Sequence, residues 1–350
     1  MEKRFFKIKG KYNLECGDYL SDIEICYHIS KEYNTTNSKP KKVVWITHAL
    51  TANSNPAEWW NVLVGENKFF NPREYTIICA NILGSCYGST SPLSENPKTK
   101  KPYLLDFPKT TIRDIANCHN LLLNHLNISK VDLLIGGSVG GFQALEWSIL
   151  HPDKIKNLVL LACNARFTPW GSAFNESQRM ALFADHTFAQ QNFSKEGDKY
   201  ESSGGKNGLA AARSIALLSY RSYAGYNSTQ QENDINCTFP KLAASYQQYQ
   251  GKKLVDRFNP YSYLSMLNLT DSHNIARGRN SIKEALKLIK AKTVCVGINS
   301  DILFPCEEQK FMAENITGGI YREINSKFGH DGFLLEWEQI KNIIEQENLI

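Results

Sequence analysis

A short apolar run, Val131–Ile135, leads into Gly136-Gly-Ser-Val-Gly140, and a helical pattern follows from Val139 to about Leu150. A serine between two glycines at a sharp strand-to-helix turn has to adopt a strained backbone conformation. The glycines leave room for that turn, and the first amides of the helix favour negative charge developing beside the serine. This order predicts that Ser138 is a nucleophile held above a sheet. The alternative is a glycine-rich turn in which the serine is incidental.

Short apolar runs bounded by polar or turn residues alternate with helical patterns through much of the chain. The apolar runs are Val43–Thr47, Thr76–Ala80, Val131–Ile135 and Leu158–Ala162, and strand character returns at Thr293–Ile298 and around Tyr321–Ile324. Between the second and the third run, Thr111–Leu126 carries apolar residues at helical spacing. This alternation predicts an α/β fold with a mostly parallel sheet flanked by helices on both sides.

The alternation stops after Ala162. From about Phe167 to Ser281, helical patterns and aromatic residues dominate, and few runs resemble strands. We therefore predict one core domain, formed by residues 1–166 and 282–350, that is interrupted by a helical lid insertion at residues 167–281. A chain of 350 residues is long enough for a large α/β domain with an insertion of this size.

Composition excludes several classes of protein. No run of about 18 apolar residues occurs, so we expect no membrane span, and the charged N-terminus does not resemble a signal peptide. The nine cysteines form no CxxC pairs, which favours free thiols in a reducing compartment and a cytoplasmic protein. The eight histidines show no spacing typical of a metal site, so we expect no metal. The net charge of +5 is dispersed, which indicates no nucleic-acid partner and is compatible with an anionic small substrate.

A serine nucleophile needs a base, and the base needs an orienting acid. In a sheet of this kind the acid and the histidine follow the serine in the chain, each after a later strand. Asp301 follows the run Thr293–Ile298, and His330 follows the last strand-like run. We predict a catalytic triad of Ser138, Asp301 and His330. The alternatives are that Asp301 caps the helix expected near Pro305 and that His330 is a surface residue.

Acyl transfer also needs two backbone donors for the oxyanion of the tetrahedral intermediate. The amide of Val139, directly after the nucleophile, is one candidate, and the amide of Leu50 in His48-Ala-Leu-Thr51 is the other. His48 itself is interpreted as structural, because it precedes the Leu50 donor and lies on a loop other than that of Ser138. The chain has neither the GxxxxGK[ST] phosphate-binding motif nor the glycine spacing of a dinucleotide fingerprint.

A triad alone permits acyl transfer without choosing among esterase, peptidase, thioesterase and acyltransferase. Longer segments are more specific than the serine turn. One of these segments extends the serine turn, Gly136-Gly-Ser-Val-Gly-Gly-Phe-Gln-Ala-Leu-Glu-Trp147. The others are His48-Ala-Leu-Thr51, Asn81-Ile-Leu-Gly-Ser-Cys-Tyr-Gly-Ser-Thr-Ser-Pro92, Phe107-Pro-Lys-Thr-Thr-Ile-Arg-Asp114, Ala173-Phe-Asn-Glu-Ser-Gln-Arg179, Arg213-Ser-Ile-Ala-Leu-Leu-Ser-Tyr-Arg-Ser222 and Phe258-Asn-Pro-Tyr-Ser-Tyr-Leu264. In these segments the chain resembles the homoserine O-acetyltransferase family, the acyltransferases of methionine biosynthesis with an α/β-hydrolase fold.

The resemblance implies a ping-pong reaction in which Ser138 takes an acetyl group from acetyl-CoA and passes it to the hydroxyl of L-homoserine. Acetyl-CoA would be a co-substrate, with no other cofactor, and the lid would form a homodimer. The resemblance also points to Arg213 for the substrate carboxylate, Asp331 for its ammonium group, and Tyr220 beside them. The alternatives for these residues are a solvated helix charge, a helix N-cap and a core aromatic residue, respectively.

The chain departs from the family pattern in three places. Thr51-Ala-Asn-Ser-Asn55 replaces Thr-Gly-Asp-Ser, Val139 replaces a common methionine, and Asn268–Asn274 differs from a Met-Asp-x-His-Asp run. Within the family, the alternatives are a homoserine O-succinyltransferase and a serine O-acyltransferase. Outside it, they are a serine esterase or hydrolase, and a binding protein without catalytic activity.

Overall fold

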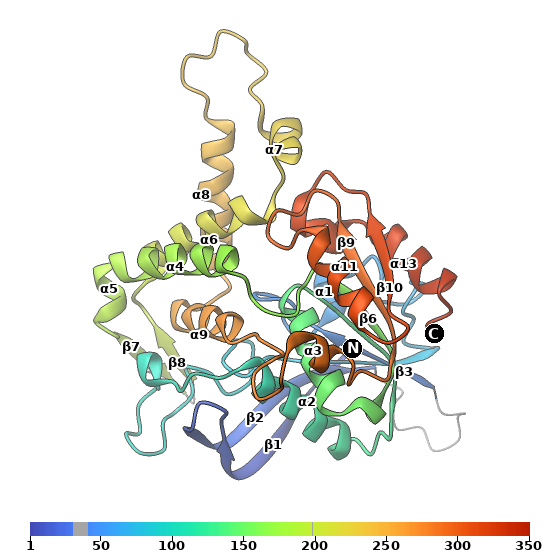
Figure 1. Ribbon diagram of the computed structural model, residues 1–350. Helices are drawn as coiled ribbons and strands as arrows, with labels where there is room; N and C mark the ends of the chain where they lie inside the picture. Colours follow the sequence, from blue (N-terminus) through green and yellow to red (C-terminus); the bar gives the residue numbers. More distant parts are fainter. Residues whose placement is uncertain (31–40, 198) are drawn as a thin grey trace.

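The computed structural model describes residues 1–30, 41–197 and 199–350. Within these residues, an eight-stranded sheet in the order β1-β2-β4-β3-β5-β6-β9-β10 forms the centre of the molecule (Figure 1). From β4 to β10 all neighbouring strands are parallel, whereas β1 and β2 form an antiparallel hairpin at one edge. The strands are β1 (Glu2–Asn13), β2 (Tyr19–Ile29), β3 (Lys42–Thr47), β4 (Tyr75–Ala80), β5 (Val131–Gly137), β6 (Ile155–Leu161), β9 (Lys292–Ile298) and β10 (Ile320–Ile324).

The six strand-like segments of the sequence all form strands of this sheet, which confirms the predicted α/β fold. The sequence does not predict the antiparallel hairpin of β1 and β2. Alternate residues along much of β1 are exposed and many of them are lysine, so the strand contains no continuous apolar run. A half-covered edge strand has this alternation, whereas the central parallel strands are covered on both faces.

Helices cover both faces of the sheet. In β5 and β6, Leu134 and Leu158 belong to one hydrophobic core, while their neighbours Ile135 and Val159 belong to another. This division follows from the strand geometry, because successive side chains point to opposite faces. Helices α2 (Ile112–His125), α3 (Val139–Leu150), α10 (Ile282–Leu286) and α11 (Cys306–Asn315) contribute to the first core, and α13 (Trp337–Gln346) contributes to the second.

The short elements lie in the connections of the core. They are α1 (Pro56–Trp59), α12 (Gly332–Leu335) and the 3-10 turns η1 (Leu104–Asp106), η2 (Pro152–Lys154) and η3 (Gly329–Asp331). No helix of the described residues is both long enough and apolar enough to span a membrane.

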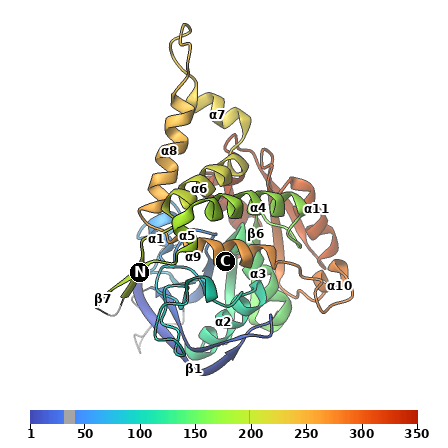
Figure 2. The same ribbon diagram turned by 90° about the vertical axis from the view of Figure 1, so that its left-hand side faces the viewer.

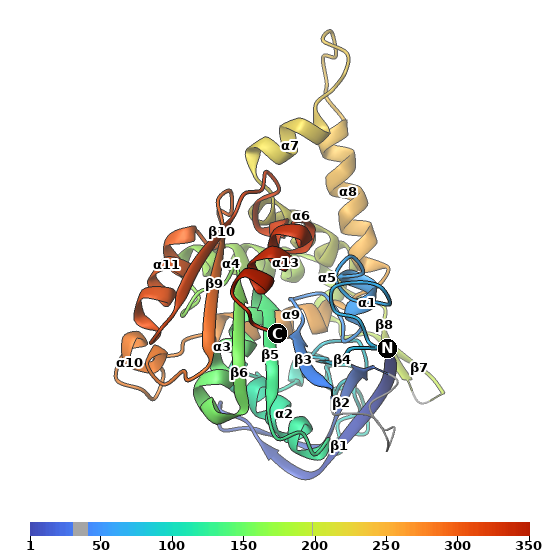
Figure 3. The same ribbon diagram turned by 90° about the vertical axis from the view of Figure 1, so that its right-hand side faces the viewer.

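A mostly helical segment separates β6 from β9. Its helices are α4 (Pro169–Ala184), α5 (His186–Ala189), α6 (Lys206–Tyr220), α7 (Tyr223–Gln230), α8 (Leu242–Val255) and α9 (Pro260–Asp271). Helices α4 and α6 cover the edge of the sheet at which α3 begins (Figures 1 and 2). Helices α7 and α8, with the residues that connect them, form an arm whose outer end projects away from the rest of the molecule, while α8 also packs against α6 (Figures 1 and 3).

This segment also contains a short antiparallel hairpin, β7 (Phe193–Glu196) with β8 (Lys199–Ser202), that the sequence does not predict. All four residues of β7 are exposed, so the strand carries no apolar pattern by which it could be recognised. The boundaries of the lid insertion at residues 167 and 281 stay a prediction.

Candidate active site

Ser138 lies at the turn between β5 and α3 with φ 57° and ψ −127°, a strained conformation for a residue with a side chain. The flanking glycines are needed because β3 lies against the turn. A Cβ atom on Gly136 would lie 2.1 Å from Thr47 Oγ1, and one on Gly140 would lie 2.2 Å from the Thr47 carbonyl oxygen. Thr47 Oγ1 also donates a 2.7 Å hydrogen bond to the Gly140 carbonyl. The glycine pattern is therefore a steric requirement of this turn.

Asp301 and His330 form a buried hydrogen-bonded pair. His330 Nδ1 donates to Asp301 Oδ2 over 2.7 Å, and both side chains are almost completely buried. The other oxygen, Oδ1, accepts the amides of Leu303 at 2.8 Å and Phe304 at 3.0 Å. Helix α11 begins only at Cys306 with Pro305 as its N-cap, so Asp301 does not cap that helix. The two backbone amides hold the Asp301 carboxylate in place, and the carboxylate orients the His330 imidazole.

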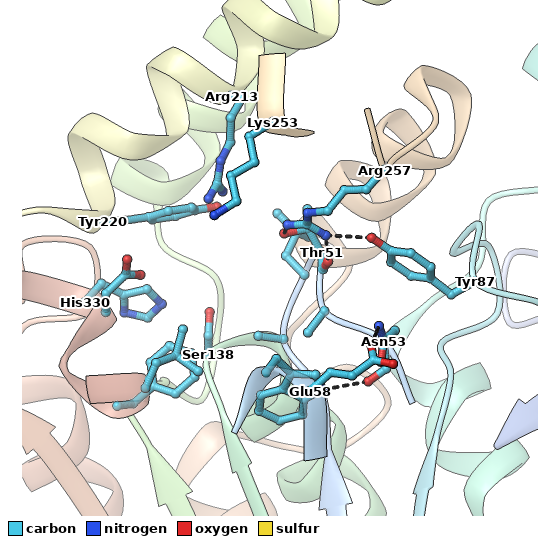
Figure 4. A pocket seen from close by; sticks show the side chains of 17 residues that line it. Thr51, Asn53, Glu58, Tyr87, Ser138, Arg213, Tyr220, Lys253, Arg257 and His330 are labelled. Carbon is cyan, nitrogen blue, oxygen red and sulfur yellow. Dashed lines mark hydrogen bonds between the residues drawn. The ribbon is translucent and has the colours of Figure 1, made fainter. Parts of the chain in front are cut away.

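With Nδ1 carrying its proton toward Asp301, His330 Nε2 is the nitrogen that can accept a proton. Nε2 is buried and has no hydrogen-bond partner among the described residues. Ser138 and His330 line the same cavity, which has a volume of about 580 Å³ (Figure 4). No hydrogen bond joins the two side chains in the described structure, and such bonds are often long before substrate binds.

The two predicted oxyanion donors are both available. In the described part of the chain, neither the Leu50 amide nor the Val139 amide donates to a protein acceptor. Val139 is the first residue of α3, where backbone amides have no acceptor within the helix. Leu50 lines the main cavity, and both residues line a small cavity of about 20 Å³ that also contacts Ser138. Two free amides therefore flank the serine.

Gln143, a buried residue of α3, joins the first turn of that helix to the loop that carries the Leu50 amide. Gln143 Nε2 donates to the carbonyl of His48 at 2.9 Å and to that of Val139 at 3.1 Å. Its Oε1 accepts a 3.0 Å hydrogen bond from His119 Nε2, since the amide nitrogen is already the donor. The Gln143 side chain is fully buried, so these bonds have no competition from water. The sequence offers one signal for this role, a polar residue within an otherwise apolar stretch of helix.

His48 is a structural residue of the same loop. Its Nε2 accepts the amide of Ile82 at 3.0 Å, and its Nδ1 donates to the Ala49 carbonyl at 2.9 Å. Burial lowers the pKa of His48 to about 4. Because both ring nitrogens are occupied and the ring is neutral, His48 has no free lone pair with which to act as a base, as expected from the sequence.

The three residues expected to contact the substrate line the cavity of Ser138 and His330. Arg213, on α6, holds its guanidinium 5.6 Å from the ring centroid of Tyr220, and no carboxylate pairs with it within the described ranges. The Tyr220 ring packs 5.7 Å from that of His330, and burial raises the pKa of its hydroxyl. Arg213 is therefore a free cation inside the cavity, and Tyr220 is a wall of the site.

Asp331 does not cap α12, because its side chain makes no cap hydrogen bond. Instead, its Oδ2 forms an ion pair with Arg221, which follows α6 directly. The Ser222 hydroxyl donates to the Lys327 carbonyl, and a Cβ atom on Gly329 would lie 2.8 Å from the Arg221 backbone. These contacts attach the loop of His330 to the end of α6. Arg221 has no local sequence signal, since its partner is 110 residues away.

Comparison with known proteins identifies the family of the chain. Residues 42–337 match the family described as alpha/beta hydrolase fold. A homoserine O-acetyltransferase of Cyclobacterium marinum is 41% identical over 345 residues, which cover 99% of this chain and 95% of the relative. The enzyme of the same name from Thermus thermophilus is 37% identical and covers 97% of this chain and 90% of the relative. The chain belongs to the homoserine O-acetyltransferase family.

Solved structures show the same fold. Homoserine O-acetyltransferase from Bacillus anthracis superposes with a TM-score of 0.86 at 21% identity, over 99% of this chain and 96% of that one. Esterase E22 superposes with a TM-score of 0.84 at 23% identity, over the full length of both chains. The α/β-hydrolase fold is thus shared by this family and by esterases, and at these identities the superpositions describe the fold alone.

Three fully buried histidines make stability depend on pH. Burial lowers the pKa of His48 and of His119 to about 4 and that of His273 to about 3, all below the ordinary value of 6.5. Between the lowered pKa values and pH 6.5, these histidines bind protons only in the unfolded chain. The contribution of these histidines to the free energy of unfolding is therefore fully present above about pH 6.5. It falls as the pH decreases below that value, by up to about 1.4 kcal/mol per pH unit for each histidine.

We expect urea unfolding between pH 7.5 and pH 5 to report this slope, and a His119→Gln variant to have a shallower one. His186→Gln is the control, because His186 is exposed and its loss should leave the slope unchanged. An identical pH slope in wild type and His119→Gln would contradict the assignment of a neutral, buried His119.

Proposed function

We propose that this chain is a homoserine O-acetyltransferase that moves an acetyl group from acetyl-CoA to the hydroxyl of L-homoserine through an acyl-Ser138 intermediate. One observation carries the proposal. The strained Ser138 and His330, which is held by the buried Asp301, line one cavity with the unpaired Arg213. A nucleophile, a base and a carboxylate-binding cation then face the same space, as a reaction between a thioester and an amino acid requires.

In the first half-reaction, Ser138 Oγ attacks the thioester carbonyl while His330 Nε2 accepts the hydroxyl proton. The Leu50 and Val139 amides bind the oxyanion, and Asp301 stabilises the charged imidazole. When the tetrahedral intermediate collapses, the C–S bond breaks and the imidazolium gives its proton to the sulfur of CoA. In the second half-reaction, His330 takes the proton of the homoserine hydroxyl, which attacks the acetyl ester. The proton then returns to Ser138.

The acceptor can be oriented by residues on both sides of His330. Arg213 offers a guanidinium fork to the carboxylate of homoserine. Asp331 uses Oδ2 for Arg221, while its Oδ1 has no hydrogen-bond partner in the described ranges and can receive the ammonium group. The Tyr220 ring lies beside the imidazole of His330, with the ring centroids 5.7 Å apart. An amino acid held at both ends presents its side-chain hydroxyl to His330.

The test combines two donors with two acceptors and measures release of free CoA. We expect acetyl-CoA with homoserine to be the best pair, and acetyl-CoA alone to release CoA at a much lower rate. Preference for succinyl-CoA or for serine would assign another acyltransferase of the same chemistry. Equally fast release without any amino acid would identify a hydrolase and contradict the proposal.

We also propose a homodimer formed through the projecting arm. The exposed fraction is 85% for Tyr223, 96% for Ile235 and 78% for Phe239, and all three belong to the arm. Figure 3 shows that the arm extends away from the remaining helices. Apolar side chains gathered at such a position are typical of a surface that is covered by a partner.

Light scattering coupled to size-exclusion chromatography is expected to give the mass of a dimer for the wild type. A double variant, Ile235→Glu with Phe239→Glu, is expected to elute as a monomer. Leu288→Glu is the control, since Leu288 is exposed on the core after α10. A monomeric wild type at micromolar concentration would contradict the dimer.

A cytoplasmic location and a role in methionine biosynthesis complete the proposal. All nine cysteines fall within the described residues and are unpaired, which supports a reducing compartment. The family relation supports the pathway.

A further inference from the structure

The C-terminal end of helix α8 and the turn that follows it supply two cations to the roof of the active-site cavity. Lys253 lies in the last turn of α8, and Arg257 lies directly after the helix and its C-cap Asp256. Both line the cavity that contains Ser138 and His330. In Figure 4, Lys253 reaches toward the space above Ser138 beside Arg213, and Arg257 lies above Thr51 and Tyr87. The side of the cavity formed by α6 and α8 thus presents three positive charges.

These charges are not neutralised by the protein. Arg257 Nη1 donates to the Thr51 carbonyl and to the Tyr87 hydroxyl, both at 2.6 Å, and both acceptors are uncharged. Lys253 Nζ lies 6.0 Å from the Tyr249 ring centroid, and no carboxylate of the described residues pairs with it. The neighbouring Lys252 differs, because its Nζ binds both carboxylate oxygens of Asp256 at 2.8 Å. Lys252 is therefore ion-paired, whereas Lys253 and Arg257 have no carboxylate partner among the described residues.

The carboxylates of the cavity are engaged elsewhere. Asp331 is bound by Arg221. Glu58 accepts hydrogen bonds from the side-chain amides of Asn53 and Asn55, both at 2.9 Å, on the opposite side of the cavity from α8. The roof of the cavity is therefore cationic, while its acidic groups lie on the side of the core.

We propose that Lys253 and Arg257 bind the diphosphate of the acyl-CoA donor. The inference rests on the proposed function, in which homoserine brings a single carboxylate that Arg213 can bind. Two further cations then need another anion, and phosphate oxygens are preferred ligands of lysine and arginine. The uncharged pantetheine arm would run through the 580 Å³ cavity from α8 to Ser138, and the nucleotide would stay at the cavity mouth.

Direct binding of CoA tests this assignment without turnover. Calorimetry should give a Kd for free CoA that is about tenfold weaker in Lys253→Ala, equivalent to about 1.4 kcal/mol. Lys252→Ala is the matched control, because Lys252 is the adjacent, ion-paired residue and should leave the Kd unchanged. Arg257 also holds Thr51 next to Leu50, so the second variant is Arg257→Lys, which keeps the charge and should retain most of the CoA affinity.

Steady-state kinetics with two acyl donors shows whether Lys253 acts on the phosphates of CoA or on the thioester. Lys253→Ala should raise the KM for acetyl-CoA about tenfold while kcat changes little. The KM values for homoserine and for S-acetyl-N-acetylcysteamine, a thioester without phosphates, should not change. The KM of the wild type for acetyl-CoA should also increase with ionic strength, because the contact lies at an exposed mouth.

Equal CoA affinity of wild type and Lys253→Ala would overturn the phosphate site. A rise in KM that is the same for both thioesters, or that appears for homoserine, would also overturn it, since Lys253 would then act on the thioester end or the acceptor. Failure of the proposed function looks different, because the wild type would then transfer acetyl from neither donor to homoserine, even if CoA bound.

Discussion

Replacing Ser138 with alanine is expected to lower kcat for acetyl transfer by roughly 10⁵-fold or more, since the acyl intermediate cannot form. The folded structure should survive. The Ser138 hydroxyl makes no hydrogen bond among the described residues, and the strain of φ 57° belongs to the backbone and not to the side chain. Release of CoA from acetyl-CoA with saturating homoserine measures the loss, and thermal unfolding reports the fold.

Ser148→Ala is the matched control in the same helix. Ser148 is buried, and its hydroxyl donates only to the Ala144 carbonyl at 2.8 Å, away from the cavity. Its loss should change kcat by less than about threefold and cost roughly 1 kcal/mol of stability. A Ser138→Ala enzyme that keeps a tenth of the wild-type rate would contradict the nucleophile assignment and with it the whole reaction scheme.

Asp301→Asn is expected to lower kcat by about 10⁴-fold with little change in the KM values. The backbone amides of Leu303 and Phe304 hold the side-chain oxygen at Oδ1, so the new NH₂ group has to face His330 Nδ1. A donor at that position forces the imidazole to carry its proton on Nε2. The ring can then no longer accept the proton of Ser138.

The contrast with KM makes this prediction specific. A merely structural loss would lower stability and affect substrate binding as well as turnover, whereas a wrong tautomer affects turnover. Nitrogen-15 NMR of the imidazole near neutral pH is expected to show the proton on Nδ1 in the wild type and on Nε2 in Asp301→Asn. A variant with a rate within tenfold of the wild type would show that Asp301 does not orient the base.

The parts of the site that lie next to their own strands are predictable from sequence. Ser138 is marked by an apolar strand, two glycines and a helix that are contiguous in the chain. Asp301 follows the apolar strand β9 and His330 follows the strand-like segment that forms β10, and the common edge of a parallel sheet brings the ends of such strands together. The order of the strands along the chain is therefore enough to predict these three residues, without knowledge of contacts between distant residues.

Residues that act through distant partners are not predictable in this way. Gln143 matters because it reaches the His48 carbonyl, 95 residues earlier in the chain, and Arg221 matters because it reaches Asp331. Lys253 and Lys252 are adjacent and identical in type, yet only Lys253 lines the cavity. The side of α8 that faces the site depends on how the lid segment packs against the core. Helical periodicity in the sequence does not predict that packing.

Mass spectrometry of the enzyme mixed with acetyl-CoA alone tests the central claim most directly. The account predicts one acetyl group on the peptide that contains Ser138, none in Ser138→Ala, and its rapid loss when homoserine is added, with formation of O-acetylhomoserine. An enzyme that never carries the acetyl group, or that loses it to water as fast as to homoserine, would contradict the account.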